Sequence, residues 1–160
     1  MTTKLSRTAC LTALRTIIAG LTFPANPTNP DGIADVTDPS TNRPRESFYL
    51  ENVRGELTIP TLRTAASSLT IDDTFTADLV IKTEVPGTTK LAAETRVEEL
   101  TDTIVAGLAL NPSLNGPFTG FIWCVPDGNL IGPEPFLVED GPTVGWGAQT
   151  VLPIHIKYRR

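Results

Sequence analysis

The stretch TFTADLVIKTEV, residues 74–85, alternates between apolar and polar side chains over most of its length. Its apolar positions are Phe75, Ala77, Leu79, Ile81 and Val85. Successive side chains of a β-strand point to opposite faces, so this period predicts a strand with one buried face and one wet face. Pro86 and Gly87 end it, because proline and glycine interrupt regular structure. The fold therefore contains a sheet with one face available for packing.

The length and charge of the chain limit what it can be. It has 160 residues, of which 40% are hydrophobic and 19% charged, and its mean hydropathy is close to zero. This composition predicts one globular domain over residues 1–160. Thirteen Lys and Arg against 18 Asp and Glu give a net charge of -5. We expect no specific nucleic-acid binding, because no summed basic charge attracts phosphates.

Two segments carry apolar residues at helical spacing. Within residues 4–21 these are Leu11, Leu14, Ile17, Ile18 and Leu21. Residues 90–110 predict a longer amphipathic helix, whose acidic residues favour its first half. Thr88 or Thr89 can cap its start, and Asn111-Pro112 ends it.

The N-terminal segment superficially imitates a secretory signal, because Lys4 and Arg7 precede an apolar run. Arg15 interrupts that run, so we expect no signal peptide. No stretch reaches the length of a membrane span, and we expect no membrane association. Cys10 and Cys124 belong to no CxxC pair and are expected to be free thiols of a reducing compartment.

Residues 22–46 predict a Pro-rich arm or loop. Its prolines are Pro24, Pro27, Pro30, Pro39 and Pro44. Proline lacks a backbone N–H, so we expect the segment not to pair into a sheet. A connection this long is uncommon inside a compact domain. A plain exposed loop and a partner-binding arm both remain open.

The other strands are predicted from shorter patterns. Residues 47–52 and 53–59 predict short strands broken around Gly55. Residues 118–125 are apolar on both alternating faces, which predicts a strand buried on two sides. Residues 126–129, Pro-Asp-Gly-Asn, predict a tight turn at which the chain reverses toward residues 135–138.

The last strand is predicted over residues 150–159. Its inward positions are Leu152, Ile154, Ile156 and Tyr158. Pro153 predicts an edge position or a bulge, because it cannot donate to a ladder. Together the elements predict a single α+β domain: a mainly antiparallel twisted sheet packed against two helices, with a long Pro-rich arm.

We find no catalytic signature in the sequence. It contains no GxxxxGK or GxGxxG, so the commonest phosphate loops are absent. The sole histidine, His155, falls on the polar face of the last predicted strand, where a solvated side chain is expected. The acidic pairs at 72–73 and 98–99 are adjacent in sequence and therefore point apart. We expect no enzyme activity, no cofactor and no metal site.

Three features instead indicate surfaces for assembly. They are the doubly apolar strand with Trp123, the glycine-rich run around Trp146, and the Pro-rich arm. Trp123 and Trp146 each fit either a core position or a subunit contact. The candidate subunit or partner interface comprises Phe121, Trp123, Trp146, Pro27, Pro30, Arg43 and Arg45.

The order of elements resembles that of the tail terminator, or tail completion, proteins of long-tailed bacteriophages. The resemblance runs from about Leu5 to Arg160: a short helix, the Pro-rich excursion, the strand DDTFTADLVI at 72–81, an amphipathic helix, a hairpin, and a final strand at 149–160 that alternates apolar and basic residues. It implies a homo-oligomeric ring, a hexamer, that caps the tail tube, ends tube polymerisation and joins the tail to the head.

The resemblance also implies partners and a location. The partners would be the tail tube protein and a head-completion or connector protein, with DNA passing through the ring. The location would be the virion tail at the head–tail junction, after assembly in the host cytoplasm. The family supplies no catalytic residues. Two alternatives remain: another head–tail connector or tail-tube component, which an open polymer would indicate, and a small soluble binding module.

Overall fold

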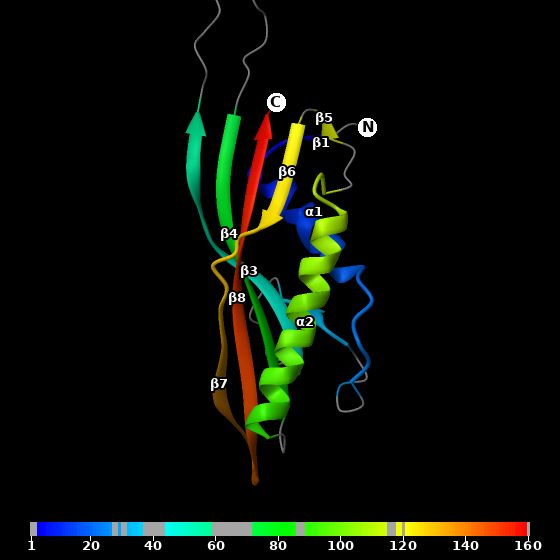
Figure 1. Cartoon of the computed structure of the whole chain (residues 1–160), viewed down its shortest axis with the longest axis vertical. Helices are drawn as coiled ribbons and strands as arrows, with labels where there is room; N and C mark the ends of the chain where they lie inside the picture. The colour runs from blue at the N-terminus through cyan, green and yellow to red at the C-terminus, as the bar shows by residue number, and fades with distance from the viewer. Residues whose placement is uncertain are drawn as a thin grey trace, which may run out of the picture.

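Two long strands, β4 (Asp72–Val85) and β8 (Thr143–Arg159), pair antiparallel at the centre of the sheet. The structure is a computed structural model, which describes residues 3–26, 29, 32–36, 44–58, 72–85, 89–114, 118–119 and 121–159. The described residues form a single α+β domain in which a curled mixed sheet packs against two helices (Figure 1).

The remaining strands extend this central pair on both sides. On one side β3 (Glu46–Thr58) pairs antiparallel with β4, and the short β2 (Ala34–Asp35) pairs parallel with β3. On the other side β6 (Phe121–Pro126) and β7 (Ile131–Asp140) follow one another along β8. The six-stranded order is β2-β3-β4-β8-β6, with β7 also on β8. Because β2–β3 is the parallel pairing, the sheet is mixed.

Two further short strands, β1 (Thr3–Lys4) and β5 (Phe118–Thr119), form a separate parallel pair. The main sheet twists strongly along its length. In Figure 1, β3 lies at the left edge at the top, whereas β7 lies at the left edge at the bottom. Strand twist of one hand accumulates over long strands such as β4 and β8, which accounts for this exchange.

The two helices begin at side-chain caps. α1 (Arg7–Ala19) begins after Ser6, whose Oγ accepts a hydrogen bond from the backbone N–H of Ala9 at 3.1 Å. α2 (Lys90–Leu110) begins after Thr89 and ends at Asn111, so the predicted 90–110 helix is confirmed. The helix expected within residues 4–21 is shorter, because capping by Ser6 starts it at Arg7.

The core lies between the helices and one face of the sheet. β4 and β8 supply alternate residues to it, as their sequence periods predict. The buried residues of these strands and of α2 include Phe75, Leu79, Ile81, Leu152, Ile154, Ile156, Tyr158, Val97, Leu100, Ile104 and Leu108. The opposite face of the central strands carries Thr74, Thr76, Lys82 and His155, which are half-buried. Asp78 and Val80 lie on this face of β4 too but are buried, so the expectation of a wet face is wrong at these two positions.

The predicted reversal at residues 126–129 is wrong. β6 and β7 both run antiparallel to β8, so the chain passes from one to the other without changing direction. The long strand β8 offers a continuous edge, and both segments pair along it. The reversal comes later, between Asp140 and Thr143.

The expectation that residues 118–125 are buried on both faces is also wrong. Ile122 and Cys124 are buried, but Trp123, on the other face of β6, is 39% exposed. In the described part of the chain, the helices cover only the face of the sheet to which Ile122 and Cys124 point. Val125, on the same face as Trp123, is therefore only half-buried.

Pro153 lies in the central strand β8, contrary to the edge or bulge that its residue type predicts. Its carbonyl accepts a hydrogen bond from the Asp127 N–H in the connection between β6 and β7. In a strand the N–H and C=O of one residue point to the same side. The side of Pro153 that lacks an N–H therefore faces the connection between β6 and β7. No strand pairs with β8 at that point, so no backbone donor is required there.

Residues 46–58 form one strand rather than two. The register shifts between Glu51 and Arg54, and Asn52 takes a positive φ of 50°. The discontinuity is thus a bulge ahead of Gly55, and pairing with β4 resumes at Arg54. The expectation that the arm stays out of the sheet fails at Ala34–Asp35, which pairs with Ser47 and Phe48.

The helices of the described residues include none long and apolar enough to cross a membrane.

Candidate interaction surface

The β7–β8 hairpin is closed by a two-residue loop, Gly141-Pro142. Asp140 and Thr143 pair across it, and Gly141 takes a φ of +60°. A positive φ at the first central residue is what a type II′ hairpin turn requires, and glycine adopts it without a steric penalty. The loop joins β7 and β8 with no further residues between them, so the hairpin ends in a narrow tip.

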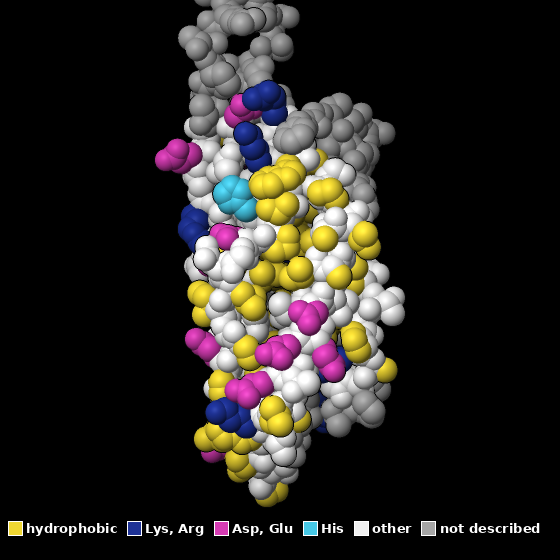
Figure 2. All heavy atoms as spheres, viewed as in Figure 1, with side chains coloured by type: hydrophobic (Ala, Val, Ile, Leu, Met, Phe, Trp, Pro, Cys, Tyr) yellow, Lys and Arg dark blue, Asp and Glu magenta, His cyan; other side chains and the backbone are white. Residues whose placement is uncertain are grey.

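Apolar side chains are exposed near this tip. Leu137 is 60% exposed and Val144 is 59% exposed. Leu137 lies directly opposite Trp146, and Val144 is two residues from Trp146 on the same strand, so all three project from the same face. Figure 2 shows apolar side chains in yellow at this lower end of the molecule. We call Leu137 and Val144 the hairpin patch.

Trp146 itself is half-buried and packs against the core cluster. Of the two possibilities that the sequence left open for it, packing against the protein's own sheet is observed. It also forms the inner border of the hairpin patch, because its cross-strand neighbour is exposed. A subunit that covered the hairpin patch would therefore also contact the exposed part of Trp146, which borders the core.

The free edge of β7 adds backbone groups to this surface. Within the described strands β7 pairs with β8 alone. The pair that flanks a two-residue loop is hydrogen-bonded, so Glu139, Leu137 and Pro135 turn their backbone groups outward. Pro135 has no N–H, which restricts the outward donors to the tip of the hairpin.

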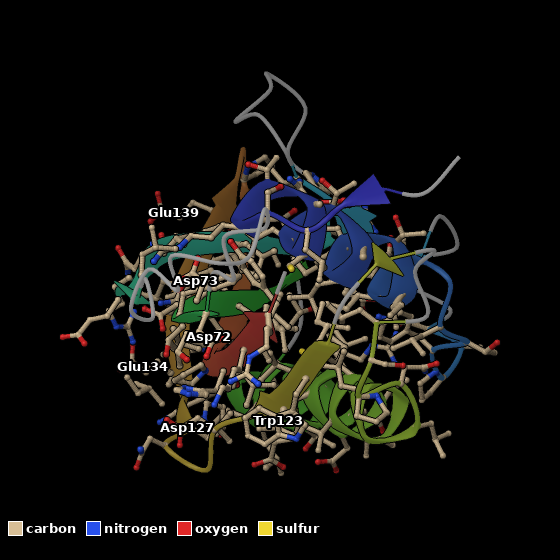
Figure 3. All side chains as sticks on the ribbon, turned by 90° about the horizontal axis from the view of Figure 1, so that it is seen from above. Asp72, Asp73, Trp123, Asp127, Glu134 and Glu139 are labelled. Carbon is tan, nitrogen blue, oxygen red and sulfur yellow. The ribbon has the colours of Figure 1, made fainter. Side chains whose placement is uncertain are left out.

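Trp123 marks a second surface, on the open face of the sheet. Its ring packs edge-on against His155, with 6.1 Å between centroids, and His155 Nδ1 lies 3.2 Å from Thr76 Oγ1. Figure 3 shows Trp123 projecting from β6 away from the space between the helices, and Figure 2 shows His155 in cyan on the same outer face. His155 is half-buried by these contacts, rather than fully solvated as its sequence position predicts.

Two ion pairs lie on the open face. Arg54 makes two hydrogen bonds to the Asp78 carboxylate, at 2.9 and 3.0 Å, and these hold the pKa of Asp78 below its usual value. Arg159 makes two similar bonds to Asp72, which likewise lower the pKa of that carboxyl. These carboxylates stabilise the pairing of neighbouring strands and are not arranged for proton transfer.

A pocket of about 390 Å³ lies at the base of the arm. Its apolar walls are formed by Ala19, Leu21, Phe23, Pro24 and Ile33. Arg96 is the one charged residue among the described residues that line it. We call it the arm-base pocket.

Beside the pocket, Arg96 and Glu46 form a buried ion pair. The Arg96 Nε and Nη2 donate to the two Glu46 oxygens at 2.7 and 3.0 Å, and Asn26 Nδ2 donates to Oε1 at 2.7 Å. Burial alone would raise the pKa of Glu46, but hydrogen bonds from Arg96, Asn26 and Asn29 outweigh it and lower that pKa. The pair joins α2, β3 and the arm.

The described residues contain no group of three or more His, Cys, Asp or Glu side chains that could hold a metal ion. Both cysteines are buried and free, and burial raises the pKa of each thiol to about 12. A neutral, buried thiol is a poor nucleophile.

The thiols provide a direct test of this packing. We expect neither Cys10 nor Cys124 to react with a disulfide reagent such as DTNB at pH 8 in the folded protein, because the thiolate is scarce and inaccessible. Both should react within minutes in denaturant, as measured by the released chromophore. Fast stoichiometric reaction of the folded protein would show that the packing around α1 and β6 is incorrect.

The sequence-predicted interface residues are dispersed. Pro27, Pro30 and Arg43 lie outside the described residues, as does the side chain of Phe121. Arg45 is exposed at the start of β3, and its carbonyl accepts a hydrogen bond from the Glu84 N–H. Trp123 and Trp146 lie on opposite faces of the sheet.

Sequence reasoning named the glycine-rich run 141–148, which includes Val144, but missed Leu137 of the hairpin patch. The signal for the hairpin was the run FLVEDGPT at 136–143, in which a Gly-Pro pair follows apolar residues. The buried pair of Glu46 and Arg96 left no local signal, because fifty positions separate the two residues.

Comparison with known proteins adds no relative: no family model matches the sequence, and no curated protein matches it.

Proposed function

We propose that this protein is a structural subunit of a bacteriophage tail. In this proposal it closes into a homo-oligomeric ring on the end of the tail tube, ends tube polymerisation and offers its other face to a head-completion protein. The hairpin patch carries the proposal: two large apolar side chains are more than half exposed beside an edge of β7 that no other described strand pairs with. Exposed apolar groups at an open edge are typical of a surface that another chain covers.

The order of elements supports the phage part of this proposal. The short α1, the Pro-rich excursion, the long β4, the amphipathic α2 and the closing strand β8 follow the order of the tail terminator resemblance. The net charge of -5 is compatible with a ring through which DNA slides, because like charges repel phosphates. No catalytic role is included, since the distinctive groups are surfaces and structural ion pairs.

A pair of hairpin variants tests the proposal. We expect Leu137→Asp or Val144→Asp to weaken self-association at least about tenfold, because burying each apolar side chain contributes about 1.5–3 kcal/mol. Light scattering over a concentration series and electron microscopy, with and without added tail tubes, would measure ring formation. The thermal midpoint should stay near that of the wild type, since both side chains are exposed in the single chain.

Leu110→Asp is the matched control. Leu110 is 82% exposed at the end of α2, away from the hairpin, so the same charge there should leave assembly unchanged. Closed rings or capped tube ends by the wild type support the proposal. Open filaments would instead indicate a tube subunit. A chain that stays monomeric and ignores tubes at every concentration would indicate a binding module.

A further inference from the structure

We propose that the base of the arm is a releasable strap that covers the start of the β3 edge, with the Glu46 carboxylate as its latch. The strap comprises the described residues 22–26, 29 and 32–36, which follow α1 and are drawn in blue at the right edge of Figure 1. It opens as a unit while β3, β4 and β8 stay folded. The inference goes beyond the function proposed above and does not depend on it.

Polar contacts hold the strap at separate points. Asn26 Nδ2 donates to Glu46 Oε1 at 2.7 Å, and the Asn29 side chain donates a further hydrogen bond to the same carboxylate. The two residues of β2 pair with β3. Asp35, at the end of β2, also accepts hydrogen bonds from Arg15 of α1 at 2.6 and 3.0 Å. The strap therefore joins α1 to the outer strand of the sheet.

Asn29 links the latch to the rest of the strap. It is 6% exposed, although asparagine is mostly an exposed residue. Its Nδ2 donates to the Gly32 carbonyl oxygen at 2.9 Å, and its backbone N–H donates to the Asn26 carbonyl oxygen at 3.0 Å. Loss of the contact with the carboxylate would therefore loosen these residues together.

The other contacts of the strap are weak compared with those of the central strands. β2 has two residues in a parallel pairing, whereas β4 pairs with β8 over all of its 14 residues. The side chains of Arg15 and Asp35 are about a quarter exposed, so solvent weakens their attraction. Phe23 and Ile33 pack against the core cluster but are only half-buried. A segment with few fully buried apolar contacts opens at a lower free energy than the core does.

Opening of the strap would uncover backbone groups of β3. The Phe48 carbonyl accepts a hydrogen bond from the Val36 N–H at 3.0 Å, and β2 lies beside Ser47 and Phe48. Without the strap, this part of β3 would be an open strand edge, which proteins commonly cover with a short strand or a loop. The strap thus protects the edge in the closed state and can expose it without unfolding of the central pair.

Native-state hydrogen exchange followed by NMR tests the strap in the wild-type chain. We expect the amides of Asn29, Gly32 and Val36 to share similar protection, because they are released together. After correction for intrinsic rates, they should exchange at least about 100-fold faster than those of Leu79 and Ile154 in the central pair. Equal protection of the strap and the central amides would show that the strap opens only with the whole domain, and would overturn the inference.

Asn29→Ala tests the latch, because it removes a hydrogen bond to Glu46 and leaves the bonds between Glu46 and Arg96 in place. We expect the amides of Gly32 and Val36 to exchange at least about tenfold faster, which is the effect of one hydrogen bond to a charged group. The amides of the central pair should keep their wild-type rates. The wild-type measurement remains a test of the strap should this variant not fold.

Asn129→Ala is the matched control. Asn129 is exposed in the connection between β6 and β7, where its side chain bonds Asp127, so the exchange of the strap should stay at the wild-type rate. If Asn29→Ala leaves the strap amides unchanged, Glu46 is not the latch. If it accelerates the strap and the central amides equally, the strap is part of the global unfolding unit, and the inference fails.

Discussion

Replacing Arg96 with leucine should lower the free energy of unfolding by about 3–5 kcal/mol, because it leaves the Glu46 carboxylate buried without its cation. The Glu46 side chain is 1% exposed and that of Arg96 is 11% exposed, so the hydrogen bonds are lost in a largely buried site. Urea unfolding followed by circular dichroism would measure the loss. A change below about 1 kcal/mol would show that the pair is solvated in the folded protein.

Arg15→Leu is the matched control. Arg15 also bonds a carboxylate, Asp35, at 2.6 Å, but both side chains are about a quarter exposed. Solvent-accessible pairs contribute about 0–1 kcal/mol. The double variant Arg96→Leu with Glu46→Leu should recover part of the loss, since an apolar pair leaves no buried charge. Recovery would separate the unpaired charge from simple loss of packing.

The pH dependence has a definite sign. The pKa of Glu46 is lower in the folded protein than in the unfolded chain, so its ionisation stabilises the fold above its unfolded pKa. That contribution is lost as the pH falls through the folded pKa. The stability difference between the wild type and Glu46→Gln should therefore shrink in acid. A difference that is constant from neutral to acidic pH would contradict the assigned pair.

This ion pair also shows where sequence reasoning stops. The helix at 90–110 was predictable to the residue, because a cap, an apolar stripe and an Asn-Pro end are local signals. The sequence of this helix gave no sign that Arg96 binds Glu46, because each residue taken alone has the pattern of a solvated charge. Long-range polar contacts depend on how elements are placed in space, which local periodicity does not determine.

The strands divide in the same way. The period of β4 and β8 predicted which residues face the core, because alternation is a property of each strand alone. The direction of β7 and the exposure of Trp123 depend on neighbours: β8 offers one edge to two successive strands, and the helices cover one face only. Leu137 of the hairpin patch was missed for this reason. An apolar residue in a strand predicts burial unless the layer that would cover it is known to be absent.

Gly55→Ala should destabilise the fold by about 3 kcal/mol, the upper part of the range for overpacking. A Cβ at this position would collide with the Thr74 carbonyl oxygen and the Phe75 Cα, both backbone atoms of β4. Backbone cannot move aside as the end of a flexible side chain can. The sequence predicted a break around Gly55, but the structure places this glycine inside β3, where two strands approach closely after the bulge.

Gly128→Ala is the matched control for Gly55→Ala, because no atom lies within 4 Å of a Cβ built at Gly128. It should change the free energy of unfolding by no more than about 0.5 kcal/mol. Equal effects of the two variants would mean that backbone entropy, rather than close approach, makes Gly55 necessary. Destabilisation by Gly55→Ala but not by Gly128→Ala would instead show that β3 and β4 are in close contact after the bulge. This contact directs the neighbouring Arg54 toward Asp78. The sequence around Gly55 predicts a break in the strand. In the structure, the bulge ahead of Gly55 would then be what allows β3 to stay paired with β4 as far as Thr58.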